Sequence, residues 1–379
     1  MIVVVGAGLA GLHTVRALRE QRYAGALTLL GAEDEPPYDR PPLSKAVLMG
    51  HADHSTLEAD WDAFGVDLRL GVRAAAVAPG VLSTDAGEVP FEQCVLATGA
   101  LPRRLPGAGV TLRTHADALA LRAALVPGAR LVIVGAGWIG SEVSTAALLA
   151  GVHVTVLEGQ ATPLANALPP EVVERMLPWW SGVDLRTGAS VAAVESDAVH
   201  LADGTRLDAD LVLVAVGARP TVVEGVALDP RGAVAVDSRL RTSVPGVWAV
   251  GDCAAWESER YATRMLVEHW DAALHAPTVV ATNVLGGDEA WDPVPYFWSE
   301  QWGRMVQYAG HHPAAERTVW REDGDTWAVF WLAGDRLVAA LSVDRPRDLV
   351  QARRLMERSA SVDDTLLADP TVAVKAAVV

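Results

Sequence analysis

The sequence predicts an α/β protein with two parallel β-sheets and their helices, followed by a smaller antiparallel α+β region. Residues 6–11 read GAGLAG and residues 135–140 read GAGWIG. Each motif follows a run of β-branched residues and precedes an amphipathic stretch. From about Pro293 onward, short apolar runs alternate with Asp/Gly turns instead. A chain of 379 residues is also too long for one core, so we expect two or three domains.

The two glycine motifs have the spacing of a phosphate-binding turn between a strand and a helix. The first glycine makes the turn tight, the second lets the backbone approach a pyrophosphate, and the third lets the helix pack on the strand. The pyrophosphate then lies at the positive end of the helix dipole. One such motif is a weak signal, but two in this setting predict a protein that holds two dinucleotides at once. The glycines are Gly6, Gly8, Gly11, Gly135, Gly137 and Gly140.

A carboxylate about 20 residues beyond each motif is expected to bind ribose hydroxyls. In the first half, residues 2–30 are predicted as strand, helix and strand, and the first carboxylate beyond them is Glu33. It comes slightly late, so the backbone of Ala32 would share the ribose. In the second half, the predicted strand 152–157 ends directly in Glu158, and no arginine occurs between Glu158 and Arg175. Because a carboxylate repels a 2′-phosphate, we expect NADH, with NADPH as the alternative.

The composition excludes several function classes. A net charge of −16 argues against nucleic-acid binding, which depends on neutralising phosphates. No apolar stretch reaches the 18 residues or so that span a bilayer, and no basic leader precedes Ile2, so we expect a cytoplasmic protein without membrane attachment. The two cysteines, Cys94 and Cys253, form no CxxC, which removes a redox-active dithiol and a cysteine-ligated cluster. No metal site is expected, and His311-His312 is interpreted as a solvated turn.

Further elements follow from local pattern. Apolar strands that run into glycine are predicted at residues 94–99 and 211–217. Another buried strand leads to Asp252, which either caps the next helix or directs its carboxylate at a cofactor hydroxyl. Near the C-terminus, strands are predicted at 317–320, 326–332 and 336–341, and a helix from about Pro346 to Ser359.

Lysine use singles out one residue. Of 31 basic residues only Lys45 and Lys375 are lysines, so a lysine is expected where a compact ammonium is wanted. Lys45 lies in the proline-rich segment 37–45, PYDRPPLSK. An exposed loop lysine is the simpler interpretation.

That segment is also the most specific part of a family resemblance. Together with ATG at 97–99, GD at 251–252, VEHW at 267–270 and YFWSEQ at 296–301, it resembles the FAD-dependent NADH:ferredoxin reductases of oxygenase systems. This family includes putidaredoxin reductase, rhodocoxin reductase and the reductase components of Rieske dioxygenases, with apoptosis-inducing factor as a relative. The resemblance covers essentially the whole chain and implies a glutathione-reductase-like architecture with two Rossmann-like domains.

The resemblance implies domain limits and binding residues. The FAD domain would comprise residues 1–108 and 236–292, the NAD domain 109–235, and the C-terminal α+β domain 293–379. Lys45 and Glu142 would form a catalytic pair beside the flavin. The other residues implied for FAD are Gly6, Gly8, Ala10, Gly11, Ala32, Glu33, Arg40, Ala74, Arg113, Asp252 and Trp270, and those for NAD are Gly135, Gly137, Ile139, Gly140, Glu158 and Gly217.

The implied reaction is hydride transfer from NADH to FAD, followed by single-electron transfer to a small [2Fe–2S] ferredoxin that serves a cytochrome P450 or Rieske oxygenase. Three alternatives stay open: a rubredoxin reductase, an NADH oxidase, and a slow NADH-sensing interaction protein. Ferredoxins are usually acidic, so an acidic reductase needs a local positive surface. The candidate surface comprises Arg345, Arg347, Arg353, Arg354 and Arg358.

Overall fold

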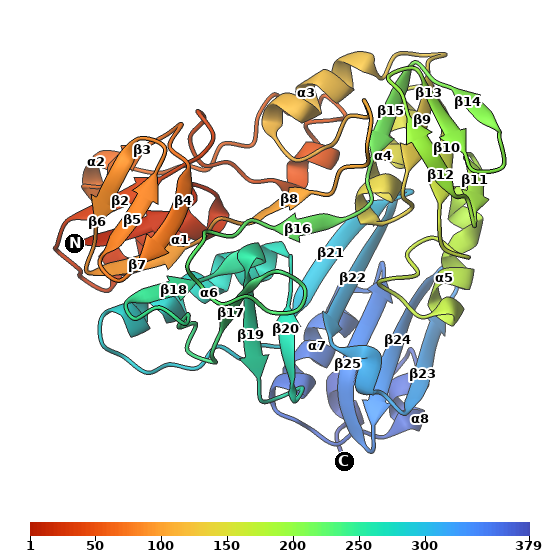
Figure 1. The fold of residues 1–379 in the computed structure, drawn as a ribbon. Helices are drawn as coiled ribbons and strands as arrows, with labels where there is room; N and C mark the ends of the chain where they lie inside the picture. The colour runs from red at the N-terminus through yellow and green to blue at the C-terminus, as the bar shows by residue number, and fades with distance from the viewer.

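The first parallel sheet has five strands. Four come from the first 100 residues of the chain, and the fifth, β18, comes from much later in the sequence. The computed structural model describes residues 1–379 (Figure 1). The strand order is β18-β7-β1-β2-β3, with every neighbouring pair parallel. The bounds are β1 Ile2–Val5, β2 Leu27–Leu30, β3 Asp67–Arg69, β7 Gln93–Leu96 and β18 Val247–Ala249.

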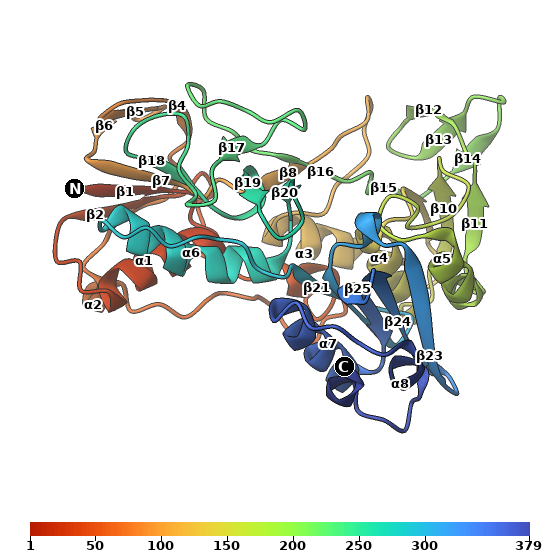
Figure 2. The same cartoon turned by 90° about the horizontal axis from the view of Figure 1, so that it is seen from below.

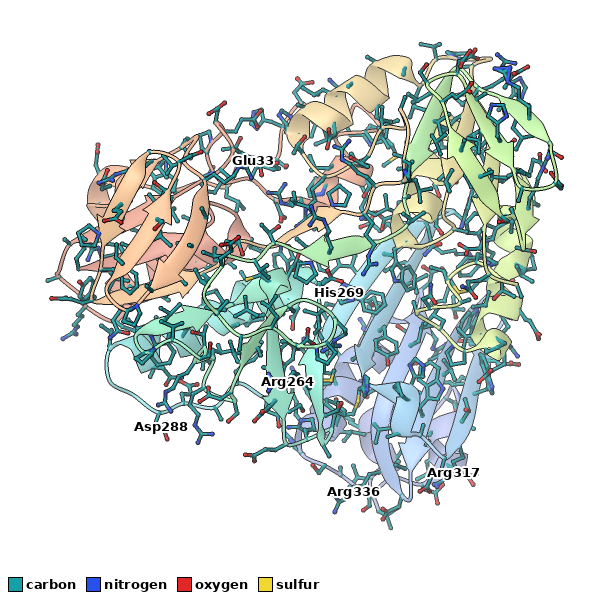
Figure 3. The ribbon with its side chains drawn as sticks, in the orientation of Figure 1. Glu33, Arg264, His269, Asp288, Arg317 and Arg336 are labelled. Carbon is teal, nitrogen blue, oxygen red and sulfur yellow. The ribbon has the colours of Figure 1, made fainter.

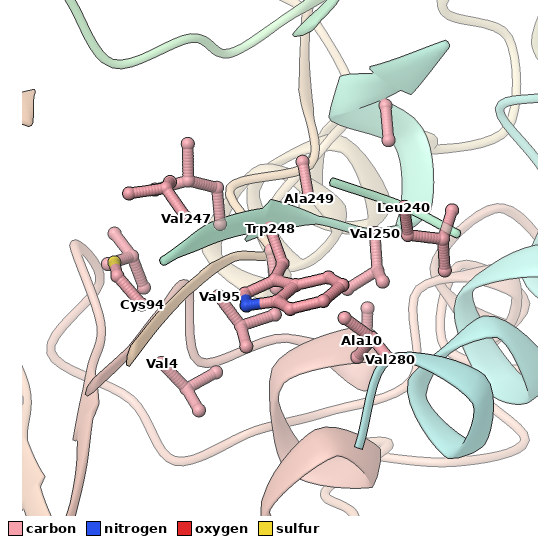
Figure 4. Close-up of a cluster of buried hydrophobic side chains, with 14 of the residues drawn as sticks. Val4, Ala10, Cys94, Val95, Leu240, Val247, Trp248, Ala249, Val250 and Val280 are labelled. Atoms are coloured by element: carbon pink, nitrogen blue, oxygen red, sulfur yellow. The ribbon is translucent and has the colours of Figure 1, made fainter. Parts of the chain in front are cut away.

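Helices cover one face of this sheet and a small sheet covers the other. Helices α1 (Leu9–Glu20) and α6 (Trp270–Val284) lie side by side below it in Figure 2, and strands β4–β6 lie above it. The small sheet comprises β4 Ala74–Ala78, β5 Val81–Thr84 and β6 Gly87–Pro90, and the short helix α2 spans Trp61–Phe64. Figure 4 shows part of the core between the parallel sheet and its helices, where Val4, Val95 and Trp248 pack near Val280 of α6.

The second parallel sheet repeats the arrangement of the first. Its order is β11-β10-β9-β15, so in both sheets the strand before the glycine motif is central and the chain later crosses to its other side. Ligands of open α/β sheets bind at the carboxyl edge where the strand order reverses. The strands of this sheet are β9 Arg130–Val134, β10 His153–Glu158, β11 Asp184–Thr187 and β15 Leu211–Val214. The helices of this half are α3 His115–Ala124, α4 Trp138–Leu149 and α5 Pro170–Met176. A small separate sheet comprises β12 Val191–Val194, β13 Ala198–Leu201 and β14 Arg206–Asp208.

Two antiparallel strands, β8 (Ala100–Pro102) and β16 (Ala218–Pro220), join the two halves. Beyond them, β17 Val234–Val236, β19 Ala254–Ser258 and β20 Thr263–Leu266 form a further small sheet. Val223 and Val234 pack in the core of the first half, so the chain contributes to that core before residue 236. The exact domain limits stay a prediction.

The C-terminal region is an antiparallel sheet of order β21-β22-β25-β24-β23, drawn in blue in Figure 1. Its strands are β21 Tyr296–Gln301, β22 Arg304–Gly310, β23 Arg317–Asp323, β24 Thr326–Ala333 and β25 Arg336–Val343, packed with helices α7 Pro346–Glu357 and α8 Asp364–Ala368. The three strands and the helix predicted here are all present, because turn residues mark their ends in the sequence. No helix anywhere in the chain has the length and apolarity needed to cross a membrane.

Candidate active site

The two glycine motifs form turns of matching geometry. Gly6 and Gly135 have φ values of +111° and +107°, a region that L side chains rarely adopt. A Cβ at Gly6 would lie 2.1 Å from the Ala97 carbonyl oxygen, and one at Gly135 would lie 2.4 Å from that of Ala215. Each motif therefore turns against the strand across the switch point of its own sheet.

The middle glycines face open space instead. Gly8 and Gly137 precede α1 and α4, and no side chain caps either helix. A Cβ at either position would have no other heavy atom within 4 Å. Both helix N-termini thus offer room and backbone donors for a pyrophosphate, so the residues present fit two dinucleotides.

Glu33, Tyr38 and Arg40 form a polar cluster at the edge of the first cradle. Arg40 donates to Glu33 Oε1 at 2.6 Å and to the Tyr38 hydroxyl at 2.8 Å, and Tyr38 donates to the other Glu33 oxygen. Burial alone would raise the pKa of Glu33, but the charge of Arg40 and these hydrogen bonds lower it below its ordinary value. Glu33 is thereby held ionised, as a ribose-binding carboxylate needs to be. Figure 3 labels it beyond the end of the first sheet.

Asp252 is paired with Arg113 and caps no α-helix. It lies inside a 3-10 helix of residues 251–253, while the next α-helix begins at Trp270 with His269 as its N-cap. The helix-cap interpretation of Asp252 is therefore wrong. Its carboxylate accepts from Arg113 Nη2 at 3.2 Å, and the Nε of Arg113 is buried without a partner. Both side chains keep hydrogen-bonding capacity for a polar ligand.

Aromatic side chains surround the N-terminus of α6. The indole of Trp270 donates to Asp39 Oδ1 at 2.8 Å and contacts Trp298 edge-on at 5.4 Å between ring centroids. His269 stacks on Phe297 at 4.3 Å. Burial lowers the pKa of His269 to about 4, so its ring is neutral at pH 7. Figure 3 places His269 near the middle of the molecule, where the C-terminal strands approach the rest.

Glu158 lies where the dinucleotide fingerprint requires it. It is the last residue of β10, and its carboxylate accepts from the backbone N–H of Ala136, inside the glycine turn, at 2.8 Å. Its other oxygen accepts from Gln160 N–H at 2.8 Å. The carboxylate is thus fixed beside the second cradle.

Lys45 and Glu142 join the proline-rich segment to the helix that starts at the second cradle. Lys45 ends a 3-10 helix of residues 41–44, and its Nζ donates to Glu142 Oε2 at 2.8 Å. Glu142 lies in the second turn of α4, and its side chain is only 4% exposed. Its Oε2 also accepts from Ser44, and its Oε1 accepts from Ser299 of β21 at 2.6 Å. The simpler interpretation of Lys45, an exposed loop lysine, is therefore wrong.

The remaining sequence-predicted residues belong to several elements of the two halves. Ala10 and Ile139 are the second residues of α1 and α4, and Ala10 is buried whereas Ile139 is 39% exposed. Ala32 follows β2, Ala74 begins β4, and Gly217 follows β15 with φ +96°. Their cofactor contacts stay a prediction.

The candidate docking arginines are not all free. Arg345 pairs with Asp348 at 2.5 Å, and Arg353 pairs with Asp271 at 2.9 Å. Arg347, Arg354 and Arg358 are exposed and form no ion pair. The positive surface is therefore smaller than the sequence suggests.

Comparisons with known proteins agree over the full chain. The model of the pyridine nucleotide-disulphide oxidoreductase family matches residues 1–276, and that of the reductase C-terminal domain matches residues 296–378. The chain is 38% identical to the ferredoxin–NAD(+) reductase component of the anthranilate 1,2-dioxygenase system of Burkholderia cepacia, over 98% of both chains. It superposes on the crystal structure of Fdr9 with a TM-score of 0.94 and 46% identity over 98% of both chains. Superposed on the covalent putidaredoxin reductase–putidaredoxin complex, it has a TM-score of 0.93 and 32% identity over 99% of this chain and 97% of that one.

Proposed function

The chain belongs to the pyridine nucleotide-disulphide oxidoreductase family, and on that premise we propose that it is an NADH-dependent ferredoxin reductase. It takes a hydride from NADH and delivers electrons singly to a small [2Fe–2S] ferredoxin that serves a Rieske oxygenase or a cytochrome P450. The names of its relatives support this, since one is a ferredoxin–NAD(+) reductase component of a dioxygenase system and another was crystallised with putidaredoxin. When bound, FAD supplies the step from two-electron to one-electron transfer.

The observation that carries the proposal is the pair of matching cradles joined by Lys45 and Glu142. The segment that carries Lys45 follows β2 of the first sheet, and the helix that carries Glu142 starts at the second cradle. Their contact at 2.8 Å therefore ties the FAD side to the NADH side. Such a contact suits two cofactors whose reactive rings must lie against each other.

The two cysteines bear on which molecule accepts electrons from the flavin. Many flavoproteins with two such cradles pass electrons to a dithiol, but Cys94 and Cys253 are buried, free and unpaired. Burial raises the pKa of both thiols, which makes them poor nucleophiles. Electrons from this site therefore leave to an external acceptor. Two buried free thiols also suit a reducing compartment, and we place the enzyme in the cytoplasm.

The remaining residues take roles consistent with their positions. Asp252 binds the ribityl chain of FAD, and Arg113 also binds FAD. Glu33 and Ala32 bind the adenosine ribose, and Trp270 lines the flavin ring. Glu158 binds the free 2′-hydroxyl of NADH. The division into residues 1–108 with 236–292, 109–235 and 293–379 is part of this proposal. The shared core of β1, β7 and β18 supports the joining of the two FAD segments, and Val223 and Val234 of that core lie before residue 236.

Rapid mixing of the purified protein with NADH tests the proposal, with an acidic [2Fe–2S] ferredoxin and cytochrome c as acceptors. We expect fast bleaching of the flavin and cytochrome reduction that depends on ferredoxin. Fast bleaching with oxygen consumption and no ferredoxin effect would make the protein an NADH oxidase. Slow bleaching would favour an NADH-sensing interaction protein. Cytochrome c reduction that proceeds at the same rate when rubredoxin takes the place of ferredoxin would favour a rubredoxin reductase.

A further inference from the structure

Ser299 extends the Lys45–Glu142 pair into the C-terminal region. Its hydroxyl donates to Glu142 Oε1 at 2.6 Å, and the residue is only 1% exposed. It also accepts from Gln301 Nε2 at 3.4 Å. Glu142 Oε2 is bound from the other side by Ser44 and Lys45. The two oxygens of one buried carboxylate are thus held by two different parts of the chain.

Two further contacts flank Ser299, one from the same strand and one from the residue just after its end. At one end, the ring of Phe297 meets the edge of Trp138, the first residue of α4, at 4.9 Å between centroids. At the other end, the backbone N–H of Trp302 donates to Thr145 Oγ1 at 2.9 Å. The ring of Trp302 also packs against Trp180 at 5.0 Å.

The spacing of these contacts shows how β21 fits the helix. Residues 138, 142 and 145 are separated by four and three positions, so they share one face of α4. Phe297 and Ser299 are two positions apart, so they share one face of β21. The strand therefore lies along the helix whose N-terminus forms the second cradle, and Ser299 is the polar contact at its centre.

We propose that Ser299 is a positioning residue for hydride transfer from NADH, acting through Glu142 on Lys45. The inference rests on the proposed function. Without the Ser299 hydroxyl, Glu142 Oε1 would be a buried charged oxygen with no donor, and its carboxylate could rotate away from Lys45. A hydrogen bond to a charged group is worth enough to change a rate about tenfold or more.

The test compares Ser299→Ala with Ser299→Thr, which keeps a hydroxyl. Ser342→Ala is the matched control, because Ser342 is equally buried in the same sheet and its hydroxyl has no hydrogen-bond partner. Flavin reduction is followed by rapid mixing at saturating NADH and, separately, with dithionite, which needs no positioned nicotinamide. We expect Ser299→Ala to slow the NADH reaction about tenfold and leave the dithionite reaction unchanged. Ser299→Thr should recover most of the rate.

Amine acylation gives a second readout that needs no turnover. The chain has two lysines, and Lys375 is exposed near the C-terminus, so it serves as an internal reference. The side chain of Lys45 is only 13% exposed and is paired with Glu142. We expect Ser299→Ala to raise the acylation of Lys45 several-fold over that of Lys375, as measured by mass spectrometry, because a released carboxylate no longer shields the amine.

Three outcomes would overturn the inference. The first is an unchanged NADH reaction and unchanged Lys45 acylation in Ser299→Ala. The second is an equal loss of rate with NADH and dithionite together with loss of FAD, which would make Ser299 purely structural. The third is a wild-type flavin that NADH does not reduce, which would overturn the proposed function as well.

Discussion

Lys45 and Glu142 lie 97 residues apart in the chain, and their charged groups meet at 2.8 Å. Both are largely buried, and taking two charges out of water costs about as much as their attraction returns. Removing one partner is far more costly, because it leaves an unpaired buried charge. The pair is therefore better explained as a fixed geometry between loop and helix than as a source of stability.

Breaking the Lys45–Glu142 pair should slow the reduction of the flavin by NADH more than it slows the later transfer of electrons to ferredoxin. In Glu142→Gln a neutral amide replaces the carboxylate, so the amide oxygen can still accept from Lys45 but the ammonium loses its counter-charge. We expect the limiting rate of flavin reduction by NADH to fall about 10–100-fold, with a similar fall in Lys45→Met. Because the two residues act as a unit, the double variant should be little slower than either single one. Rates that simply multiply in the double variant would contradict this.

The two open glycines allow the cofactor assignments to be tested separately. A Cβ at Gly8 or Gly137 meets no protein atom, so Gly8→Ala and Gly137→Ala should both fold with unchanged thermal midpoints as apoproteins. A bound pyrophosphate would meet that Cβ, since the middle glycine permits its close approach. We expect Gly8→Ala to lose FAD and Gly137→Ala to keep FAD but bind NADH at least about tenfold more weakly. The reverse pattern would exchange the two assignments. Gly6→Ala is the contrasting variant and should fail to fold, because its Cβ would lie 2.1 Å from a carbonyl oxygen.

The sequence predicts both parallel sheets and their glycine turns because those features depend on local spacing. Glu158 could be placed for the same reason, since it directly follows its strand. Ser299 could not be found in this way. Its bond to Glu142 joins residues 157 positions apart, and a serine at a buried strand position carries no spacing signal. The sequence could not predict the pairing of Arg353 with Asp271 either, because an arginine on a helix face is expected to be exposed to solvent.

Glu158 should set the preference for NADH. Its carboxylate accepts from two backbone N–H groups, and a hydrogen bond that it accepts from a ribose hydroxyl is worth roughly 1.5–3 kcal/mol. We expect Glu158→Gln to lower the ratio of kcat/KM for NADH to that for NADPH by about tenfold or more. Asp184→Asn is the control, because Asp184 is an exposed carboxylate on the neighbouring strand β11. A wild-type enzyme with a tenfold preference for NADPH would refute the interpretation of Glu158.

Ferredoxin docking should depend on the unpaired arginines in α7 and at its C-terminal end. Arg354→Glu with Arg358→Glu removes two exposed positive charges that no carboxylate neutralises. We expect slower ferredoxin reduction that depends on ionic strength, while reduction of a small dye is unchanged. Arg353→Gln is a contrasting variant, because Arg353 is held by Asp271 and its loss should lower the thermal midpoint instead. Equal losses with ferredoxin and dye in the double variant would exclude this surface.

His269 should make the fold less stable in mild acid. Burial lowers its pKa to about 4 from an ordinary value of 6.5. Between these values the unfolded chain binds a proton that the folded chain does not, so stability falls as the pH drops from 6.5 towards 4. Below pH 4 the full loss in the free energy of unfolding would be of order 3 kcal/mol. His269→Phe keeps an aromatic ring against Phe297 and removes the titration, so its thermal midpoint should fall less than that of the wild type between about pH 7.5 and pH 5. The same fall in both proteins would show that other groups govern the acid response.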